Sequence, residues 1–421
     1  MGDNEPWLSR IADTVRRSGT GLITDEGRVS WAELVDRAWK IAADLRAYPH
    51  GLVVAPDGGP DSVVALLAAG LAEPAQPWVI GDPARWGTGE PIGGTALWAA
   101  GPQAAPPAEI DGATYATATE SVTGQPQLLF GRPDSLHEAA RLYAEGLPEF
   151  ADAELFAACA PMDFAETFHL VVLPSIVLGR DLMLFQPRQW RAAGTAFDGR
   201  PVVCLTTTAL ALLGARAAPE DRDYTGVCFL PSGGGLTPER AERVAARFAG
   251  CSFLNVLGSP ETGLLAVTRE VAEDGHVGKP LAGKQIWLRD VGEDGVGTLW
   301  TAGPDARIAA SDGFLRRTPD GAVSKGHLAH AVPGGGFVLD GQAGDLVELD
   351  GRSVDPAEVV AAVRGLRGVV DASLTVDRSG PAERVTVVAT GDVTEEQVRR
   401  RLGALAVALV PHEVVCHIPT A

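Results

Sequence analysis

Short apolar runs alternate with amphipathic segments through the first half of the chain, and this alternation constrains the fold more than any other feature. Residues 51–55 and 226–230 are continuous apolar runs of strand length. Residues 31–46 place apolar side chains on one helical face, and Ser30 with Glu33 forms a capping box in front of them. Buried strands joined by helices form parallel sheets. The sequence therefore predicts an α/β fold.

Two regions depart from this alternation. Residues 86–107 are rich in Gly, Pro and Ala, which predicts a surface excursion. Beyond about residue 275, short strands with frequent turns are expected. A last unit with a hairpin strand, two helices and two further strands predicts a compact α+β domain. A length of 421 residues favours two domains, 1–340 and 341–421.

Composition excludes several classes of partner. The formal net charge of −19 argues against a nucleic acid partner. The N-terminus lacks a basic region followed by an apolar run, and no window is apolar enough to span a bilayer, so a cytoplasmic protein without a membrane partner is expected. The five cysteines are scattered and form no CxxC pair, which predicts neither a zinc site nor a disulfide framework.

Five glycine-rich or polar motifs follow one another along the chain. Residues 231–239 carry three consecutive glycines after a buried strand, and residues 255–263 carry the second motif. The other three are 277–283, 297–304 and 350–359. In this order they resemble the adenylate-forming superfamily, which includes acyl-CoA synthetases, adenylation domains of peptide synthetases and luciferases. Residues 29–34 also fit, so the resemblance covers nearly the whole chain.

The resemblance implies a fold and a set of ligands. It implies a large N-terminal AMP-binding domain, with helices flanking its sheets and a small β-rich part, and a small mobile α+β C-terminal lid domain. It implies ATP and magnesium as cofactors and a small acyl or aryl carboxylate as substrate. CoA, or the phosphopantetheine of an acyl carrier protein, would be the acyl acceptor.

The first two motifs would line the ligand pocket. A glycine lets the backbone approach a flat ligand closely, because no side chain intrudes. The family resemblance gives these positions to the adenine and acyl pockets: Gly233, Gly234, Gly235, Gly258 and Ser259. Glu261 would hold the magnesium ion. Taken alone, the glycine run could equally form a tight turn, and Glu261 could cap a helix.

The family's phosphate loop is matched only in part. Residues 120–127 keep Thr123 and Gly124, but Gln127 replaces the lysine and Glu120 adds a carboxylate. Loops of this kind hold phosphates with backbone N–H groups and a cation. An amide in place of a cation, together with an extra anion, opposes polyphosphate binding. The alternative is a connector between a strand and a helix.

Other positions that handle ATP in the family have also changed. Leu257 replaces the aromatic residue that stacks on adenine, and Pro260 supplies neither a hydroxyl nor an N–H group. His327 stands where an aspartate would accept hydrogen bonds from two ribose hydroxyls, and imidazole cannot do so. Residues 341–344 lack both charged members of the family's hinge. No lysine occurs from 341 to 421, although the family uses a C-terminal lysine to stabilise the transition state.

Three side chains could take over catalysis. His327 and Lys325 are two positions apart at the former ribose site, where they could act as an acid–base pair. His169 is expected near the wall of the acyl pocket. For each of them the alternative is a purely structural role.

Three functions remain open at this stage. The first is a diverged homologue in specialised metabolism that acts on an acyl thioester of CoA or of a carrier protein, without ordinary ATP-dependent adenylation. The second is a conventional ATP-dependent acyl-CoA or acyl-AMP ligase. The third is a protein that binds an acyl group or a carrier protein without catalysis.

Overall fold

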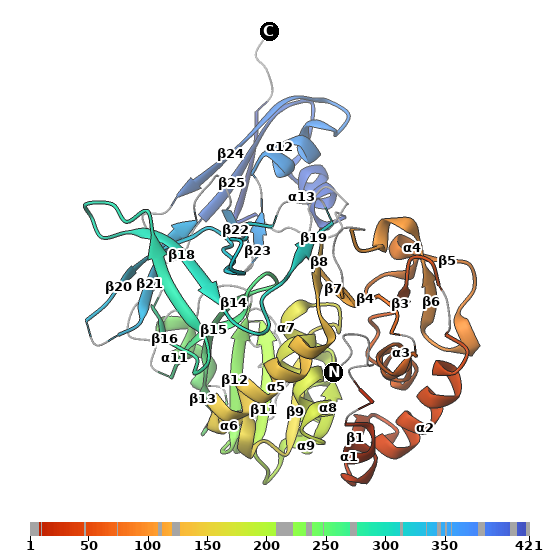
Figure 1. Cartoon of the computed structure of the whole chain (residues 1–421). Coiled ribbons are helices and arrows are strands. Elements are labelled where there is room, and N and C mark those ends of the chain that lie inside the picture. The colour runs from red at the N-terminus through yellow and green to blue at the C-terminus, as the bar shows by residue number, and fades with distance from the viewer. Residues whose placement is uncertain are drawn as a thin grey trace.

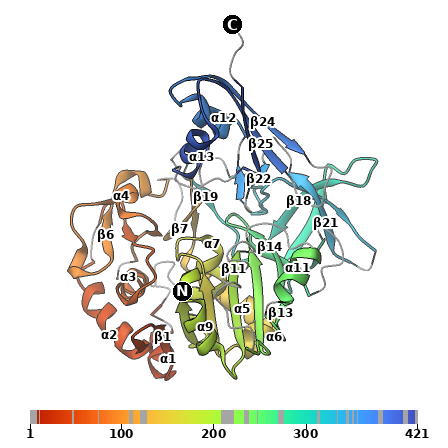
Figure 2. The same cartoon turned by 180° about the vertical axis from the view of Figure 1, so that it is seen from behind.

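The computed structural model describes most of the chain. The described residues are 8–9, 11–45, 48–73, 75–107, 112–119, 127–207, 222–232, 238–246, 248–269, 276–311, 315–333, 335–342, 347–349, 352–354, 356–377, 384–404 and 411–417. Figure 1 shows the red, yellow and green part of the chain below and the C-terminal blue unit above it, and Figure 2 shows the same arrangement from behind. No helix among the described residues is long and apolar enough to cross a membrane.

The first large sheet is mostly parallel. Its strand order is β13 (Ser252–Phe253), β12 (Val227–Ser232), β11 (Val202–Thr207), β9 (Leu155–Cys159), β10 (Asp181–Leu184), β1 (Gly21–Thr24) and β2 (Gly27–Ser30). All neighbours are parallel except the β1–β2 hairpin. This confirms the α/β fold that the alternation of strands and helices predicted.

A second sheet is mixed, with a parallel centre and antiparallel pairs on both sides of it. Its order is β19 (Ala309–Ala310), β8 (Leu128–Gly131), β7 (Tyr115–Ala118), β4 (Trp78–Ile80), β3 (Leu52–Val54), β6 (Leu97–Ala100) and β5 (Gly87–Thr88). Successive residues of β3 face opposite sides, since Leu52 and Val54 join one buried core whereas Val53 joins another. Residues 86–107 were predicted to be a surface excursion, and this is wrong. They contain β6, whose Leu97 is fully buried.

Helices pack on both sheets and between them. They are α1 (Ala12–Arg17), α2 (Trp31–Ala42), α3 (Pro60–Leu71), α4 (Pro83–Trp86), α5 (Pro133–Gly146), α6 (Pro148–Asp152), α7 (Ala165–Thr167), α8 (Leu173–Val177), α9 (Trp190–Phe197) and α11 (Pro238–Ala245), with short helical turns η1 (Ile92–Gly94), η2 (Pro102–Ala104), η3 (Phe168–Val172) and η4 (Pro187–Gln189). The Ser30 hydroxyl accepts a hydrogen bond from the Glu33 N–H and caps the start of α2, which is one of the two hydrogen bonds of the predicted capping box. Because α3 is buried on nearly all sides, it packs between layers of the structure.

The third sheet is antiparallel throughout and forms the β-rich part. Its order is β14 (Asn255–Ser259), β15 (Gly263–Thr268), β16 (His276–Pro280), β21 (Phe337–Gln342), β20 (His327–Ala331), β18 (Gly297–Ala302) and β17 (Gln285–Arg289). This matches the expected change to short strands and turns.

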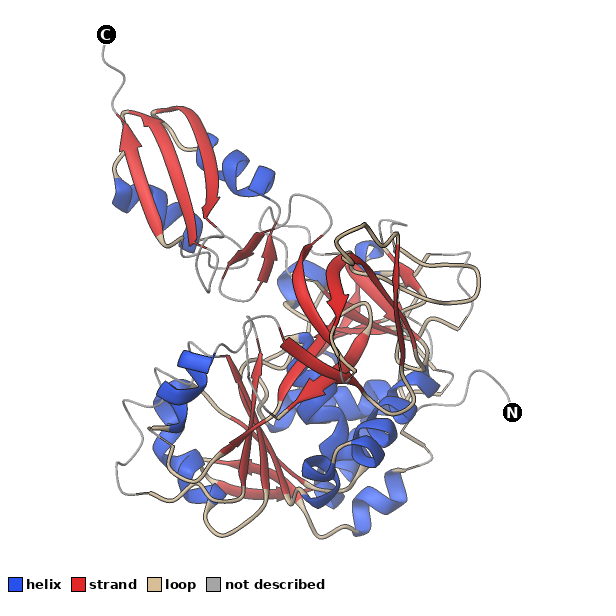
Figure 3. Cartoon of the chain, turned by 90° about the vertical axis from the view of Figure 1, so that its left-hand side faces the viewer, coloured by secondary structure: helices blue, strands red, loops and turns tan. Residues whose placement is uncertain are grey.

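The C-terminal part has a core of its own. After the hairpin of β22 (Val347–Leu349) and β23 (Arg352–Val354), helices α12 (Pro356–Arg364) and α13 (Glu395–Gly403) pack on a sheet of β24 (Val369–Asp377), β25 (Arg384–Gly391) and β26 (Glu413–His417). Figure 3 shows this sheet apart from the others. Two strands were predicted after the hairpin, and β26 is a third. The boundary between residues 340 and 341 stays a prediction.

Candidate functional site

A hairpin carries the second glycine-rich motif. Strands β14 and β15 pair antiparallel, and residues 260–262 form the turn. A methyl group on Gly258 would meet the Gly263 carbonyl oxygen at 2.7 Å. Gly263 has a φ of +66°, and a methyl group there would collide with the Asp305 carboxylate. The hairpin itself therefore requires both glycines, so Gly258 has a structural role independent of any ligand.

The neighbouring pocket candidates also face inward. Leu257 is 6% exposed and belongs to the core of the third sheet. Ser259 is buried, and its N–H and hydroxyl lie 3.1 and 3.0 Å from the Thr262 hydroxyl oxygen. The structure thus gives Leu257 a packing role and Ser259 a hydrogen-bonding role within the turn.

Glu261 has one carboxylate oxygen that is not used within the described structure. Its Oε2 atom is buried and has no hydrogen-bond partner among the described residues. Magnesium binds oxygen ligands and commonly takes one or two carboxylates together with phosphate oxygens and water. No group of three or more His, Cys, Asp or Glu side chains arranged for a metal occurs in the described part of the chain. The buried Glu261 oxygen therefore fits a magnesium ion that takes most of its other ligands from phosphate and water.

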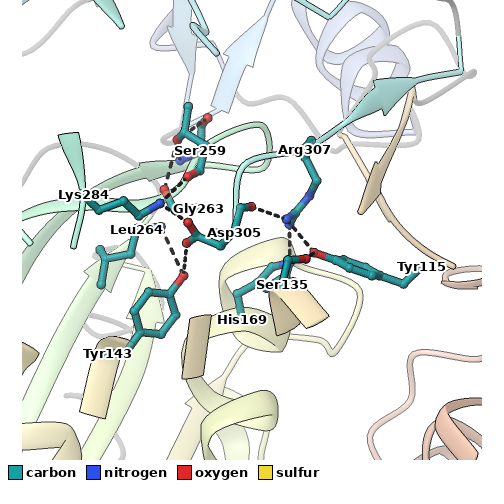
Figure 4. A network of polar contacts seen from close by, with 11 residues as sticks. Tyr115, Ser135, Tyr143, His169, Ser259, Gly263, Leu264, Lys284, Asp305 and Arg307 are labelled. Atoms are coloured by element: carbon teal, nitrogen blue, oxygen red, sulfur yellow. Dashed lines mark hydrogen bonds and ion pairs between the residues drawn. The ribbon is translucent and has the colours of Figure 1, made fainter. Parts of the chain in front are cut away.

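A buried ion pair lies directly behind this hairpin (Figure 4). Lys284 forms an ion pair with Asp305, and its ammonium donates to the Thr262 carbonyl at 2.9 Å. The Tyr143 hydroxyl donates to the other Asp305 oxygen at 2.7 Å. Burial lowers the pKa of Lys284, whereas the neighbouring Asp305 raises it. These contacts connect the turn of the hairpin to α5 and to the segment that follows β18.

A second buried cation continues the network toward β7. Arg307 donates through Nη1 to the Tyr115 hydroxyl at 2.8 Å and to the Asp305 carbonyl at 2.8 Å. Its Nη2 contacts the His169 imidazole and the Thr117 hydroxyl, the latter at 3.4 Å. Figure 4 shows Arg307, Tyr115 and His169 converging from different elements.

His169 is neutral in this environment. Burial holds the pKa of His169 well below its usual value of 6.5, and the charges of Arg307 and Lys284 lower it further. Its Nε2 faces the donor groups of Arg307, so Nε2 accepts and the proton resides on Nδ1. Nδ1 is buried without a partner among the described residues. His169 lies in η3, a short π-helical turn, and such turns occur frequently at functional sites.

The predicted pair of His327 and Lys325 lies at and just before the start of β20 in the third sheet. His327 begins β20 and is 7% exposed, whereas Lys325 is half-buried. Burial lowers the pKa of His327 to about 3, and the charge of Lys325 contributes to this shift. The imidazole is therefore neutral at pH 7 and offers a single acceptor nitrogen.

The ends of the predicted phosphate loop are joined by hydrogen bonds. The Gln127 N–H donates to the Thr119 hydroxyl at 3.1 Å, and the Thr119 N–H donates to the Gln127 carbonyl at 2.8 Å. Other candidate positions lie outside the described residues, namely Glu120, Thr123, Gly124, Gly233, Gly234 and Gly235.

Sequence reasoning missed the buried network around Asp305. The one sequence feature that pointed to this network was weak: Lys284 is one of only four lysines in the chain. A lysine or aspartate within a largely apolar stretch needs a partner if it is buried. The sequence does not show which residue that partner is.

Comparison with known proteins places the chain near one kind of ligase. No family model matches the sequence. It is similar to the acyl-CoA ligase clz12 from Cochliobolus lunatus, with 29% identity over 170 residues. That match covers 36% of this chain and 49% of clz12, so it spans about half the length of that relative.

Solved structures match over nearly the whole chain. The o-succinylbenzoate CoA synthetase MenE from Bacillus subtilis, a double mutant bound to a product analogue, has a TM-score of 0.74 at 15% identity, covering 99% of this chain and 96% of MenE. ATP-bound MatB from Rhodopseudomonas palustris has a TM-score of 0.65 at 17% identity, and the match covers 98% of this chain and 95% of MatB. The chain therefore has the fold of the acyl-CoA ligases of the adenylate-forming superfamily, as its motifs predicted.

Proposed function

We propose that this chain binds an acyl or aryl group as a thioester of CoA or of carrier-protein phosphopantetheine, without ordinary ATP-dependent adenylation. The observation that carries the proposal is His327, at the position of the family's ribose-binding aspartate. An aspartate offers two oxygens with about four acceptor sites, whereas a neutral imidazole offers one nitrogen. Because His327 is buried and its pKa is about 3, it does not become a cation near pH 7.

Two further residues support the loss of nucleotide affinity. Gln127 supplies a neutral amide at the lysine position of the phosphate loop, so the attraction between a cation and phosphate is missing there. Leu257 packs into the core of the third sheet, where it is unavailable as a platform for adenine. The acyl side of the site would keep the three glycines of residues 233–235 and the chain around His169. We assign His327 a role in binding the ligand and not in acid–base catalysis. A base with a pKa of about 3 is poorly matched to proton transfer at pH 7.

We further propose that residues 341–421, which contain no lysine, form a lid over residues 1–340. The protein would work in specialised metabolism, in the cytoplasm. Its partners would be a small thioester substrate and an acyl carrier protein.

A conventional ATP-dependent acyl-CoA ligase is the second candidate. It is favoured by Glu261, whose buried Oε2 has no partner among the described residues and would suit a magnesium ion. In that case magnesium would neutralise developing charge on the phosphates of bound ATP.

Calorimetric titration distinguishes the two candidates. Wild-type protein would be titrated with ATP and Mg²⁺, and separately with a panel of short aliphatic and aromatic acyl-CoA thioesters. We expect heat from at least one thioester and none from ATP. ATP binding that depends on Mg²⁺ and is lost in Glu261→Gln would favour the conventional ligase.

Turnover separates an enzyme from a binding protein. Mass spectrometry would follow loss of any thioester that binds, with and without added carrier protein. Binding without turnover would identify a non-catalytic acyl-binding protein.

A further inference from the structure

A cavity of about 530 Å³ lies away from the predicted phosphate loop. Its walls come from the start of α5, the end of β18 and the segments on either side of β19. Gly112 and Arg132 line it, and they flank the β7–β8 hairpin at the end opposite the loop between Thr119 and Gln127. None of the predicted pocket residues lines the cavity, and Arg307 connects it to the buried network of the candidate site.

Three arginines line this cavity, and each lacks an ion pair within the described structure. They are Arg132, Arg307 and Arg317. No carboxylate of the described residues lies within ion-pair distance of any of them. Other arginines do have such a partner, for example Arg28, Arg200, Arg222 and Arg269. Arg132 and Arg317 are exposed, so water can hydrate their charges. Arg307 is 1% exposed and has no such access.

The charge of Arg307 is uncompensated in its buried surroundings. Lys284 and Asp305 neutralise each other, and burial keeps His169 neutral. Tyr115 is also neutral, since burial raises its pKa. The Arg307 guanidinium thus has only neutral partners, and its Nε is buried with no partner among the described residues. A buried charge is costly unless an opposite charge accompanies it.

The acidic residues of the cavity lie on its outer rim. Asp134, Glu138 and Asp320 also line it, and all three are exposed. A hydrogen bond from Thr318 holds the pKa of Asp320 below its usual value, so this carboxylate is charged. Exposed carboxylates are screened by water and salt, whereas the buried guanidinium is screened much less. The inner wall is therefore the positive end of the cavity.

We propose that this cavity binds a phosphate-type oxyanion, with its negative charge against Arg307. The flexible, exposed side chains of Arg132 and Arg317 would close on the same anion from the rim. Arginine is suited to this, because its guanidinium donates several directed hydrogen bonds to phosphate oxygens. The ligand is either free phosphate or the phosphate group of a small phosphomonoester. The mixed charges of the rim would contact the polar remainder of such an ester.

Phosphorus NMR tests the proposal directly. Inorganic phosphate, and separately glycerol phosphate, would be observed at constant ionic strength with increasing wild-type protein. We expect saturable line broadening with wild type and with Arg316→Ala, which removes an exposed arginine that does not line the cavity. The double variant Arg132→Ala/Arg317→Ala should bind roughly tenfold or more weakly. Both substitutions are on exposed side chains, so folding should be retained.

The outcomes distinguish free phosphate from an organic phosphate, and binding in this cavity from binding in the predicted phosphate loop. A stronger response to glycerol phosphate assigns an organic phosphate, and equal responses assign the free anion. Arg307→Gln should abolish binding, and circular dichroism would establish that this variant is folded. The proposal is overturned if wild type shows no saturable binding. It is also overturned if the double variant binds like wild type, which would place the anion elsewhere, for example in the phosphate loop.

Discussion

Two buried carboxylates, Asp181 and Asp305, hold different parts of the molecule together in different ways. Each is 1% exposed. Asp181 accepts from the Gly21 N–H at 2.9 Å and from Arg28 and Arg200 at 2.7 and 2.8 Å. These contacts attach β1 and β2 to the first sheet. The side chains of Arg28 and Arg200 are 48% and 19% exposed, so water can stabilise both cations if the carboxylate is lost.

Asp305 has partners that water cannot reach. The Lys284 side chain is 0% exposed, and Tyr143 is fully buried. The cost of breaking a buried pair arises mainly from the charge left without a partner. Two equally buried carboxylates can therefore contribute unequally to stability. The exposure of the paired cations determines how much stability is lost when each carboxylate is removed.

The largest expected effect follows from removing each carboxylate in turn. Asp305→Asn should lower the free energy of unfolding by about 3–5 kcal/mol, because Lys284 is left buried and unpaired. Asp181→Asn should cost only about 1–3 kcal/mol, the scale of hydrogen bonds to a charged group. Urea unfolding of the two variants measures the difference. An equal loss of unfolding free energy in the two variants would show that the exposure of the paired cations does not matter.

A double substitution tests whether charge or shape matters at Asp305. Lys284→Met alone should cost about 3 kcal/mol or more, because Asp305 then lies buried without its cation. Lys284→Met combined with Asp305→Leu should recover most of that loss, since buried ion pairs are often replaceable by apolar residues. Chemical denaturation of wild type, of Lys284→Met, of Asp305→Leu and of the double variant gives a double-mutant cycle for the pair. A double variant that loses the sum of the single losses would show that the two residues act independently.

Acid should destabilise the protein through His327, which is buried and neutral at pH 7. The folded pKa of His327 is about 3, below the value of 6.5 expected when it is unfolded. The unfolded state therefore binds the proton first as the pH falls. The stability that neutral His327 provides is full above pH 6.5 and is lost as the pH falls toward 3. Between pH 7 and 5 this amounts to about 2 kcal/mol.

Unfolding at several pH values checks this effect. His327→Gln should have a shallower dependence of stability on pH than wild type over that window. Identical slopes for the two proteins would show that His327 is not buried in its neutral form.

The smallest expected effect is at the exposed end of the Asp181 cluster. Arg28→Ala should cost about 1 kcal/mol or less, because half of that side chain is in water and Arg200 still neutralises Asp181. The loss should shrink further in high salt, since exposed pairs are screened. A thermal unfolding series in salt measures it. A cost above about 3 kcal/mol, independent of salt, would mean that Arg28 behaves like a buried cation.

Much of the fold could be predicted from the sequence because local patterns determine it. Strands such as β11 and β12 are apolar runs bounded by turns, and α2 has a cap and a periodic apolar face. Strand β6 was missed because Gly, Pro and Ala surround it and hide its apolar residues. Strand β26 was missed since its pairing with β25 joins residues 27 positions apart, as for Thr386 and Glu413.

The site was harder to predict than the fold. The backbone of the β14–β15 hairpin requires the glycines of its motif, and Glu261 lies in the turn, a position that the motif alone did not predict. The ion pair of Lys284 with Asp305 and the contact of Arg307 with His169 join residues 21 and 138 positions apart. Periodicity carries no information about such pairs. Only the packing of the third sheet against α5 and β7 brings them together.

We propose that the ligase fold remains while its dependence on ATP has been lost. Calorimetric titration of ATP with Mg²⁺ into wild type and into His327→Asp tests it most directly. The account predicts no binding tighter than about 1 mM for wild type, and a gain of affinity when the carboxylate is restored. Micromolar binding of ATP to wild type, weakened or unchanged in His327→Asp, would contradict it.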